Sequence, residues 1–380
     1  FGGSLDGYCY GLLAADLDGN GIDELVVGCA DKLAVFRNGA LGQNEDPDVQ
    51  RTDLKAAYGL EAVDLGFSDD NLELVVAVGN GDLYVLELSG SSLLTRLEWD
   101  SGESMSNGAG VTVSLTHAKP WVIHGGDNGI LKAWEIDGNN APQLVWSSMP
   151  QQGEWSPVYS LPGGQTWGIA TGNIDDDPAL EVLVGSGSGQ VFAFDGVTHA
   201  LDWTSPVLDK LPISIGIADL DGDGEMEIAV STGNPGENRL ADSGEGAEGS
   251  LYIFDRSGSD FTQTFRSENI NQAMGLVISE LDGSNYPEIG LATGFVQVSL
   301  GGSTDYVGHV RVFGYDGSGY DEEWSSGDLG TPVRGIAAGD PDDDGQNELV
   351  VGTYDGDVLV FHHSGANYVQ DGATISTGRV

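Results

Sequence analysis

An acidic loop that recurs five times, apolar strands rich in Val, Ile and Leu, and the lack of helical periodicity predict an all-β fold. The loop first occurs at residues 16–28 as DLDGNGIDELVVG, and its apolar end reads as a strand. Four more copies keep this register: NIDDDPALEVLVG from Asn173, DLDGDGEMEIAVS from Asp219, ELDGSNYPEIGLA from Glu280 and DPDDDGQNELVVG from Asp340. Repetition at a period of about fifty residues, with four antiparallel strands per repeat, predicts a seven-bladed β-propeller.

Each copy of the loop places oxygen-bearing side chains at loop positions 1, 3, 5 and 9. Alternate oxygens over so short a span suit a hard cation that takes about six to eight oxygen ligands, and calcium is the usual one. Glycine at position 6, as Gly21, Gly224 and Gly345, allows the sharp turn that folds the ligands inward. A single loop of this kind is also compatible with a solvated Asp/Gly turn, but five copies in register favour metal sites. An EF-hand is excluded, because the closing acid stands at position 9 rather than 12 and strands follow it.

Aligned on the loop, the chain divides into seven units. Each unit has a short first strand, the acidic loop and a second strand that ends in Gly. A tight turn, a third strand that ends in an aromatic residue and a weaker fourth strand follow. The second unit keeps the strands, but its loop is one residue longer, so Asp64 and Glu73 are out of register and calcium binding there stays open. The third unit carries THAKP at residues 116–120 where acids belong, which predicts strands without a metal site. We expect one domain with blades at approximately 8–55, 56–105, 106–155, 165–207, 212–268, 272–328 and 332–380.

A blade can bury its faces only against neighbouring blades, so the ring must close for stability. The final residues STGRV are similar to the approach to an inner strand, and we expect the two ends of the chain to meet near residues 1 and 380.

The charge balance excludes one class of partner. The chain holds 60 acidic and 14 basic residues, a net charge of −46, whereas nucleic acid binding requires a basic surface. No run of about eighteen apolar residues occurs, so no transmembrane segment is expected. An acidic, lysine-poor surface suits a saline or calcium-rich exterior, where salt screens self-repulsion, and it is equally compatible with simple solubility.

The two cysteines, Cys9 and Cys29, flank the first acidic loop. Antiparallel strands leaving that loop would place them across from each other, which predicts a cross-strand disulfide. Such a bridge would stabilise the fold by about 3 kcal/mol through loop-closure entropy and would indicate an oxidising compartment. Two free buried thiols are the alternative.

The loops resemble the FG-GAP/VCBS repeat family, the propeller repeats of integrin α-subunit heads and of many secreted microbial proteins, through the motif D-x-D-x-D-G-x-x-[DE]. The resemblance covers nearly the whole chain. It implies about five calcium ions in loops between the first and second strands of a blade, opposite the usual ligand-binding face. Pro178 and Asn285 depart from the motif at the turn glycine. The implied calcium ligands are Asp16, Asp18, Asn20, the carbonyl of Ile22 and Glu24 in blade one; Asn173, Asp175, Asp177, the carbonyl of Ala179 and Glu181 in blade four; Asp219, Asp221, Asp223, the carbonyl of Glu225 and Glu227 in blade five; Glu280, Asp282, Ser284, the carbonyl of Tyr286 and Glu288 in blade six; and Asp340, Asp342, Asp344, the carbonyl of Gln346 and Glu348 in blade seven.

The face opposite the acidic loops is the expected partner surface. Large residues stand beside glycines about six positions before the loops, and we predict that four of them contact a partner: Tyr10, Tyr58, Trp167 and Arg334. Two extended loops after second strands, residues 233–250 and 294–309, belong to the same face, and long loops on a rigid scaffold are common binding devices. In the alternative interpretation, the aromatic residues plug the central channel and the loops merely cover it.

The sequence contains no catalytic constellation: its six histidines are scattered, and no GxSxG, HExxH, paired CxxC or phosphate-binding loop occurs. The favoured function is therefore that of a secreted or cell-surface, calcium-stabilised binding or adhesion module for a protein or a glycan. One alternative is a structural subunit of an extracellular filament or surface layer, in which copies of the chain bind one another. A second alternative is a calcium-dependent polysaccharide-active enzyme, since some polysaccharide lyases of related architecture need calcium.

Overall fold

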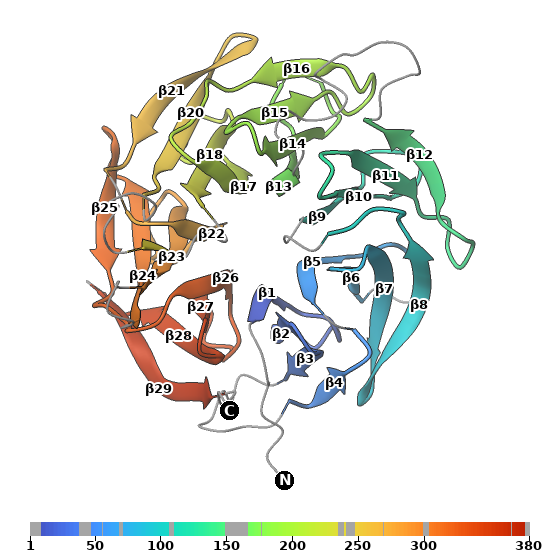
Figure 1. Cartoon of the computed structure of the whole chain (residues 1–380), viewed down its shortest axis with the longest axis horizontal. Coiled ribbons are helices and arrows are strands. Elements are labelled where there is room, and N and C mark those ends of the chain that lie inside the picture. Colours follow the sequence, from blue (N-terminus) through green and yellow to red (C-terminus); the bar gives the residue numbers. More distant parts are fainter. Residues whose placement is uncertain are drawn as a thin grey trace.

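The computed structural model describes residues 9–37, 47–54, 56–67, 71–105, 110–148, 166–175, 177–234, 239–240, 248–268, 270–298, 304–365 and 367–376. Seven sheets surround a central axis, and each is built on four antiparallel strands (Figure 1). The predicted all-β, seven-bladed β-propeller is thereby confirmed. Among the residues described, none forms a helix with the length and apolar character that a membrane crossing requires.

Within each blade the first strand lies nearest the axis and later strands lie progressively outward (Figure 1). Blades one to three comprise β1 (Cys9–Ala15), β2 (Glu24–Cys29), β3 (Leu33–Phe36) and β4 (Val49–Arg51); β5 (Ala57–Val63), β6 (Glu73–Val78), β7 (Asp82–Ser89) and β8 (Ser92–Asp100); and β9 (Val111–Ser114), β10 (Trp121–Gly125), β11 (Leu131–Glu135) and β12 (Gln143–Ser147). Blades four and five comprise β13 (Thr166–Gly172), β14 (Glu181–Ser186), β15 (Val191–Phe194) and β16 (Leu201–Thr204); and β17 (Leu211–Ala218), β18 (Glu227–Gly233), β20 (Leu251–Ser257) and β21 (Asp260–Arg266). Blades six and seven comprise β22 (Ala273–Ser279), β23 (Glu288–Val298), β24 (Thr304–Tyr315) and β25 (Tyr320–Ser325); and β26 (Val333–Gly339), β27 (Glu348–Thr353), β28 (Asp357–His363) and β29 (Tyr368–Ser376).

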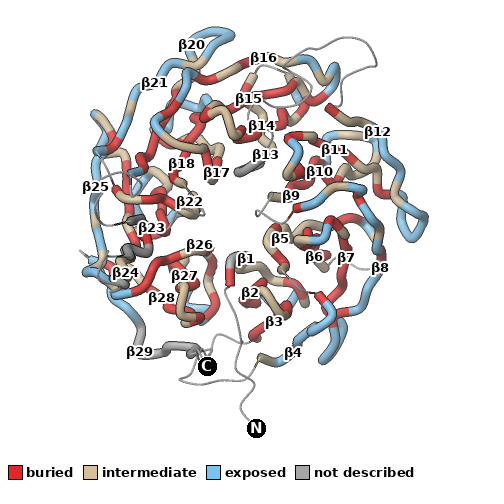
Figure 2. Tube along the Cα trace, viewed as in Figure 1, coloured by how far each residue is buried: buried red, intermediate tan, exposed pale blue. Residues whose placement is uncertain are grey.

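The core lies between adjacent blades rather than within any one of them. Every residue of the second strands β2, β6, β14, β18 and β27 is buried, because a neighbouring blade covers each face. Figure 2 shows buried residues gathered in the second and third strands, intermediate exposure along much of the innermost strands, and exposed residues along the outer strands. The glycine that ends the second strand has the same cause: a side chain at Gly28 would meet the carbonyl oxygen of Ala57 in the next blade.

The first and last blades pack directly against each other. Val27 of β2 shares one core cluster with Val350 and Val360 of blade seven, and the Asp340 N–H donates to Asp23 Oδ2 at 3.0 Å. Blades one and seven each take their four strands from one continuous stretch of chain. The ring is therefore closed there by packing between the two blades, and neither blade contains a strand from the other end of the chain. β29 reaches Ser376, and the predicted meeting of the two ends, at residues 1–8 and 377–380, lies outside the described residues.

One expected loop is a β-hairpin instead. β23 extends to Val298 and β24 begins at Thr304, so most of the stretch 294–309 continues the ladder of blade six. The short strand β19 (Arg239–Leu240), which follows β18 of blade five, pairs in parallel with Gln297 and Val298. The interpretation of 294–309 as a loop was wrong, because strand pairing continues through its flanking residues, with Gly294 opposite Gly308 and Val298 opposite Thr304.

Candidate metal centres and the opposite face

The acidic loops all lie between the first and second strands of their blades, and the closing glutamate begins the second strand. Glu24, for example, pairs across the ladder with Ala15, the last residue of β1. The same register recurs at Glu181, Glu227, Glu288 and Glu348, opposite Gly172, Ala218, Ser279 and Gly339. The first strands of the blades all run in the same direction along the central axis. A loop that follows each first strand therefore lies at the same end of the ring.

The closing glutamates are buried carboxylates held by the backbone. Their side chains are 0–2% exposed. One carboxylate oxygen of Glu24 accepts the N–H of Leu17 at 2.9 Å, and Glu181 accepts that of Ile174 at 2.9 Å. The other oxygen, Oε1, of both Glu24 and Glu181 has no hydrogen-bond partner among the described residues. Burying an ionised oxygen without a partner is costly, so a positively charged ligand would fit these atoms.

Among the described residues, two further acids surround the closing glutamate in each of at least four loops, with ligand atoms within 4.8 Å of one another. The sets are Asp16, Asp18 and Glu24; Asp175, Asp177 and Glu181; Asp219, Asp221 and Glu227; and Glu280, Asp282 and Glu288. Burial, reinforced by the neighbouring aspartates, raises the pKa of the closing glutamates to about 7 in Glu24, Glu181, Glu227 and Glu288. A divalent cation would offset both the burial and the repulsion, so the donor set fits calcium.

The turn geometry also follows the predicted pattern in three blades. Both carboxylate oxygens of Asp16 accept loop N–H groups, from Asn20 at 3.0 Å and from Gly21 at 2.8 Å. Gly21 has a φ of 90°, and Gly224 and Gly345 have φ values of 91° and 88°. Only glycine adopts this conformation without strain, which explains position 6 of the motif.

Blades four and six differ at their candidate ligands. Asn173 uses its amide group to donate to the Asp177 carbonyl at 2.6 Å. In blade six, Ser284 Oγ lies 2.7 Å from the carbonyl oxygen of Tyr286 and 3.0 Å from Glu288 Oε1. The predicted ligand Ser284 thus already contacts two other predicted ligands of that loop.

Blade two keeps the buried glutamate despite its longer loop. Glu73 is 0% exposed and accepts the N–H of Leu65 at 2.7 Å, the same contact that Glu24 makes with Leu17. The extra residue is therefore accommodated before Glu73, and residues 68–70 lie outside the description. Sequence alignment alone could not show this, because it placed Glu73 out of register.

In blade three a tryptophan takes the ladder position of the closing glutamate. Trp121 pairs with Ser114, and its ring stacks on His117 with centroids 3.5 Å apart. On the side of blade four, the centroid of His199 lies 5.4 Å from Trp121 and 5.2 Å from Trp146. Stacked rings thus occupy the seam where the neighbouring blades carry acids.

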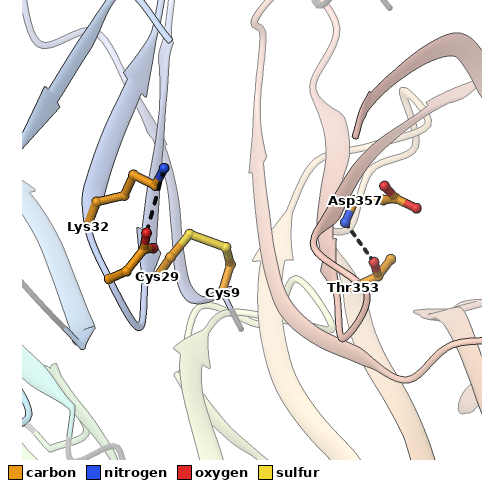
Figure 3. Close-up of a disulfide and its surroundings, with 6 residues drawn as sticks. Cys9, Cys29, Lys32, Thr353 and Asp357 are labelled. Carbon is orange, nitrogen blue, oxygen red and sulfur yellow. Dashed lines mark hydrogen bonds and ion pairs between the residues drawn. A yellow bond between two sulfur atoms is a disulfide. The ribbon is translucent and has the colours of Figure 1, made fainter. Parts of the chain in front are cut away.

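Cys9 and Cys29 face each other across the β1–β2 ladder and form a disulfide (Figure 3). Both residues are buried, at 4% and 0% exposure. The bridge lies at the end of the hairpin away from the acidic loop and joins the innermost strand to the blade-one core.

We expect the unreduced chain to resist alkylation even in denaturant, because both sulfurs are bonded to each other. Intact mass after iodoacetamide treatment should show no adduct before reduction and two adducts after it. Two adducts on the denatured chain before any reductant is added would contradict the bridge.

Two of the four predicted partner-binding residues line the central opening at the end away from the acidic loops. Tyr58 of β5 and Arg334 of β26 border a cavity of about 200 Å³ together with Met274. Burial, followed by the charge of Asp127, raises the pKa of Tyr58, so its hydroxyl stays protonated. Tyr10 and Trp167 belong to β1 and β13, but their side chains lie outside the description.

Sequence reasoning missed two aromatic residues beside Arg334. The Arg334 guanidinium carbon lies 5.6 Å from the ring centroid of Tyr354, and that ring lies 5.9 Å from Tyr306. Tyr354 follows β27, and Tyr306 belongs to the extended part of β24. The available signal was Tyr354 itself, an aromatic residue in a turn that is otherwise polar or glycine-rich in the repeats.

Neither a protein-family model nor a curated protein matches the chain. Among solved structures, it is similar to BBS1N in its complex with ARL6DN, with a TM-score of 0.62, 13% identity, and coverage of 94% of this chain and 93% of that one. It is also similar to Sqt1 of Saccharomyces cerevisiae, with a TM-score of 0.61, 14% identity, and coverage of 97% and 86%. A chain of the Mitotic Checkpoint Complex is similar as well, with a TM-score of 0.59, 14% identity, and coverage of 95% of this chain and 89% of that one. At these identities the likeness shows the β-propeller fold alone.

Proposed function

We propose that this protein is a calcium-stabilised β-propeller of the FG-GAP/VCBS type that serves as a binding or adhesion module for a protein or a glycan. The observation that carries the proposal is the buried glutamate at the end of each repeated loop, with two acids beside it in four of the loops. So many desolvated carboxylates repel one another in the absence of a cation.

In this proposal the carboxylates of the five loops and the carbonyls at loop position 7 hold the ions. Calcium then has a structural role: it neutralises the clustered acids and fixes the turn between the first two strands of the blade. Carboxylate and carbonyl oxygens are the ligands that calcium prefers, and their number in each loop leaves room for water.

The partner surface is proposed at the opposite end of the ring, around Tyr58, Arg334, Tyr354 and Tyr306. Arginine and tyrosine dominate many protein-binding hot spots, because they combine a large contact area with directional hydrogen bonds. The strands β5, β24 and β26 hold these side chains on a rigid scaffold. The acids at the other end are committed to calcium in this proposal, which leaves them less free for a partner.

An extracellular or cell-surface location is proposed from two observations. The disulfide between Cys9 and Cys29 is typical of an oxidising compartment. The net charge of −46 suits a medium with abundant salt and calcium, which screens the repulsion between like charges.

The experiment is a screen of the chain against glycan arrays and extracellular proteins at millimolar calcium, followed by affinity measurements on variants. Tyr58→Ala combined with Arg334→Ala should weaken binding of the selected partner about tenfold or more, with a melting temperature within a few degrees of wild type. Arg311→Ala, which removes the same charge from the Arg311–Glu322 ion pair of blade six, should bind normally. Unchanged affinity of the double variant would place the partner elsewhere, and ordered polymers in electron micrographs would favour the structural-subunit alternative.

A further inference from the structure

In blades two, five, six and seven, the beginning of the fourth strand packs against the acidic loop of the preceding blade. The residues that share this place, each paired with a residue near the end of the third strand, are Leu93 of β8, Phe261 of β21, Tyr320 of β25 and Tyr368 of β29. Leu93 shares a core cluster with Leu17 of the first acidic loop. Phe261 borders a cavity of about 570 Å³ together with Ile174 of the blade-four loop. The loops of blades five and six are covered by a tyrosine instead.

Tyr320 is buried beside the loop of blade five. The residue is 8% exposed and shares a core cluster with Leu220, the second residue of that loop. Its hydroxyl oxygen is buried and has no hydrogen-bond partner among the described residues. Burial, followed by the charges of Glu227 and Asp255, raises the pKa of Tyr320 above its ordinary value. The hydroxyl thus lies in the electric field of the blade-five acids.

Tyr368 has the same relation to the loop of blade six. The residue is 6% exposed, and its core cluster includes Leu281 of that loop. It lines a cavity of about 440 Å³ together with Asp282 and Ser284, two of the predicted calcium ligands. Within the described part of the chain, its hydroxyl oxygen also lacks a hydrogen-bond partner. Burial, followed by the charge of Glu288, raises the pKa of Tyr368.

Packing alone does not account for these two hydroxyl groups. Phe261 fills the same place beside the blade-four loop without a hydroxyl. A hydroxyl that is buried without a hydrogen bond destabilises the folded state, because it has lost its contacts with water. Both tyrosines face this cost, and both are buried against a loop whose acids fit a cation. The two hydroxyls therefore suit a partner that arrives with the ion.

Water bound to the ion is such a partner. Calcium takes about six to eight oxygen ligands, and water fills the positions that the protein leaves open. A cation polarises the water bound to it and makes that water a strong hydrogen-bond donor. A phenolic oxygen can accept such a bond.

We propose that Tyr320 and Tyr368 belong to the calcium sites of blades five and six, where each hydroxyl oxygen accepts a hydrogen bond from a water molecule bound to the ion. Each of these two ions then interacts with groups from two blades, because the loop and the tyrosine lie on opposite sides of a seam. This inference rests on the proposed function, which supplies the ions, and adds a residue of the following blade to two of the sites.

The test combines Tyr320→Phe with Tyr368→Phe in the full chain, which removes both hydroxyls and keeps both rings. Calorimetric titration of the chelated protein with calcium measures the affinities. Two of the bound ions should bind about fivefold more weakly than in wild type, the loss expected for one hydrogen bond, and the others should be unchanged. After chelation, the double variant should unfold at the same urea concentration as wild type or at a higher one, because the hydroxyls have no partner without the ions.

The matched control is Tyr252→Phe, which removes a blade-five hydroxyl that accepts the Asp209 N–H at 3.2 Å. This variant should lose the same stability with and without calcium and should keep every calcium affinity. If wild type binds calcium and the double variant binds it equally well, the inference is overturned while the loop sites stand. An equal loss of stability in the double variant with and without calcium would also overturn it. If wild type binds no calcium, the proposed loop sites fail as well.

Discussion

Removal of calcium should lower the stability of this chain substantially, because the proposed ions are bound by the folded state alone. A ligand present at 100 times its dissociation constant stabilises a protein by about 2.7 kcal/mol per site, and the sequence predicts about five sites. Thermal unfolding followed by circular dichroism, with millimolar calcium and after chelation, measures the effect. The melting temperature should rise with calcium concentration and should not respond in the same way to sodium.

Asp221→Ala isolates one of these sites. Asp221 belongs to the blade-five cluster with Asp219 and the buried Glu227. With calcium present, the variant should lose about 2 to 3 kcal/mol of stability, whereas after chelation it should differ little from wild type, since removing one of several repelling acids costs little. Asp321→Ala, at an exposed position of β25, serves as the control and should have little effect in either condition. An equal loss with and without calcium would argue against a metal at Asp221.

A second large effect is expected at Glu61, a mostly buried carboxylate on the inner strand β5. Counted back from the end of the first strand, the equivalent residues in blades one, four and six are Leu13, Ala170 and Val277. Burial raises the pKa of Glu61 to about 7 from its ordinary value of 4.5. A carboxyl group at this apolar position therefore folds more readily in its protonated form.

The sign of the pH dependence follows from this raised pKa. Between about pH 4.5 and 7 the folded state binds the Glu61 proton and the unfolded state releases it, so stability falls as pH rises through this window. The full penalty, about 3 kcal/mol, is present above pH 7 and absent below pH 4.5. Glu61→Leu should therefore raise the unfolding free energy by a few kcal/mol at pH 8 and by much less at pH 5.

Urea unfolding of wild type and variant at the two pH values, in the same calcium concentration, checks this expectation. Comparison at a single pH cancels the contribution of the acidic loops, which both proteins share. Glu61→Gln is the matched variant, since it keeps the shape of the side chain but cannot ionise. The difference in unfolding free energy between Glu61→Gln and Glu61→Leu should therefore not depend on pH. A Glu61→Leu effect of the same size at pH 5 and pH 8 would rule out a titrating carboxylate.

Local repetition made much of this molecule predictable. The second strands are continuous apolar runs, the acidic loops recur at a nearly constant spacing, and the first acidic loop leaves Cys9 and Cys29 on adjacent strands. All of these signals depend on residues close together in the chain. The number of blades follows from counting such signals, because each repeat is one supersecondary unit.

Other features depend on contacts that no local pattern contains. The buried position of Glu73 depends on how a longer loop folds before it. Residues 294–298 and 304–308 extend β23 and β24 because these strands pair with each other, and β23 also pairs with β19. The rings of Trp121 and His199 meet only where two blades pack together.

The sequence by itself determined the all-β class, the repeat number and the acidic loops, because hydrophobic periodicity and turn chemistry act over a few neighbouring residues. The tertiary structure alone decided which acids lie close together. Asp195 and Asp202 reach Asp175 only because the outer hairpin of blade four folds back over its first loop. Antiparallel pairing across successive strands brings residues that are twenty or more positions apart within a few ångström of one another, a distance that their spacing in the sequence does not reveal.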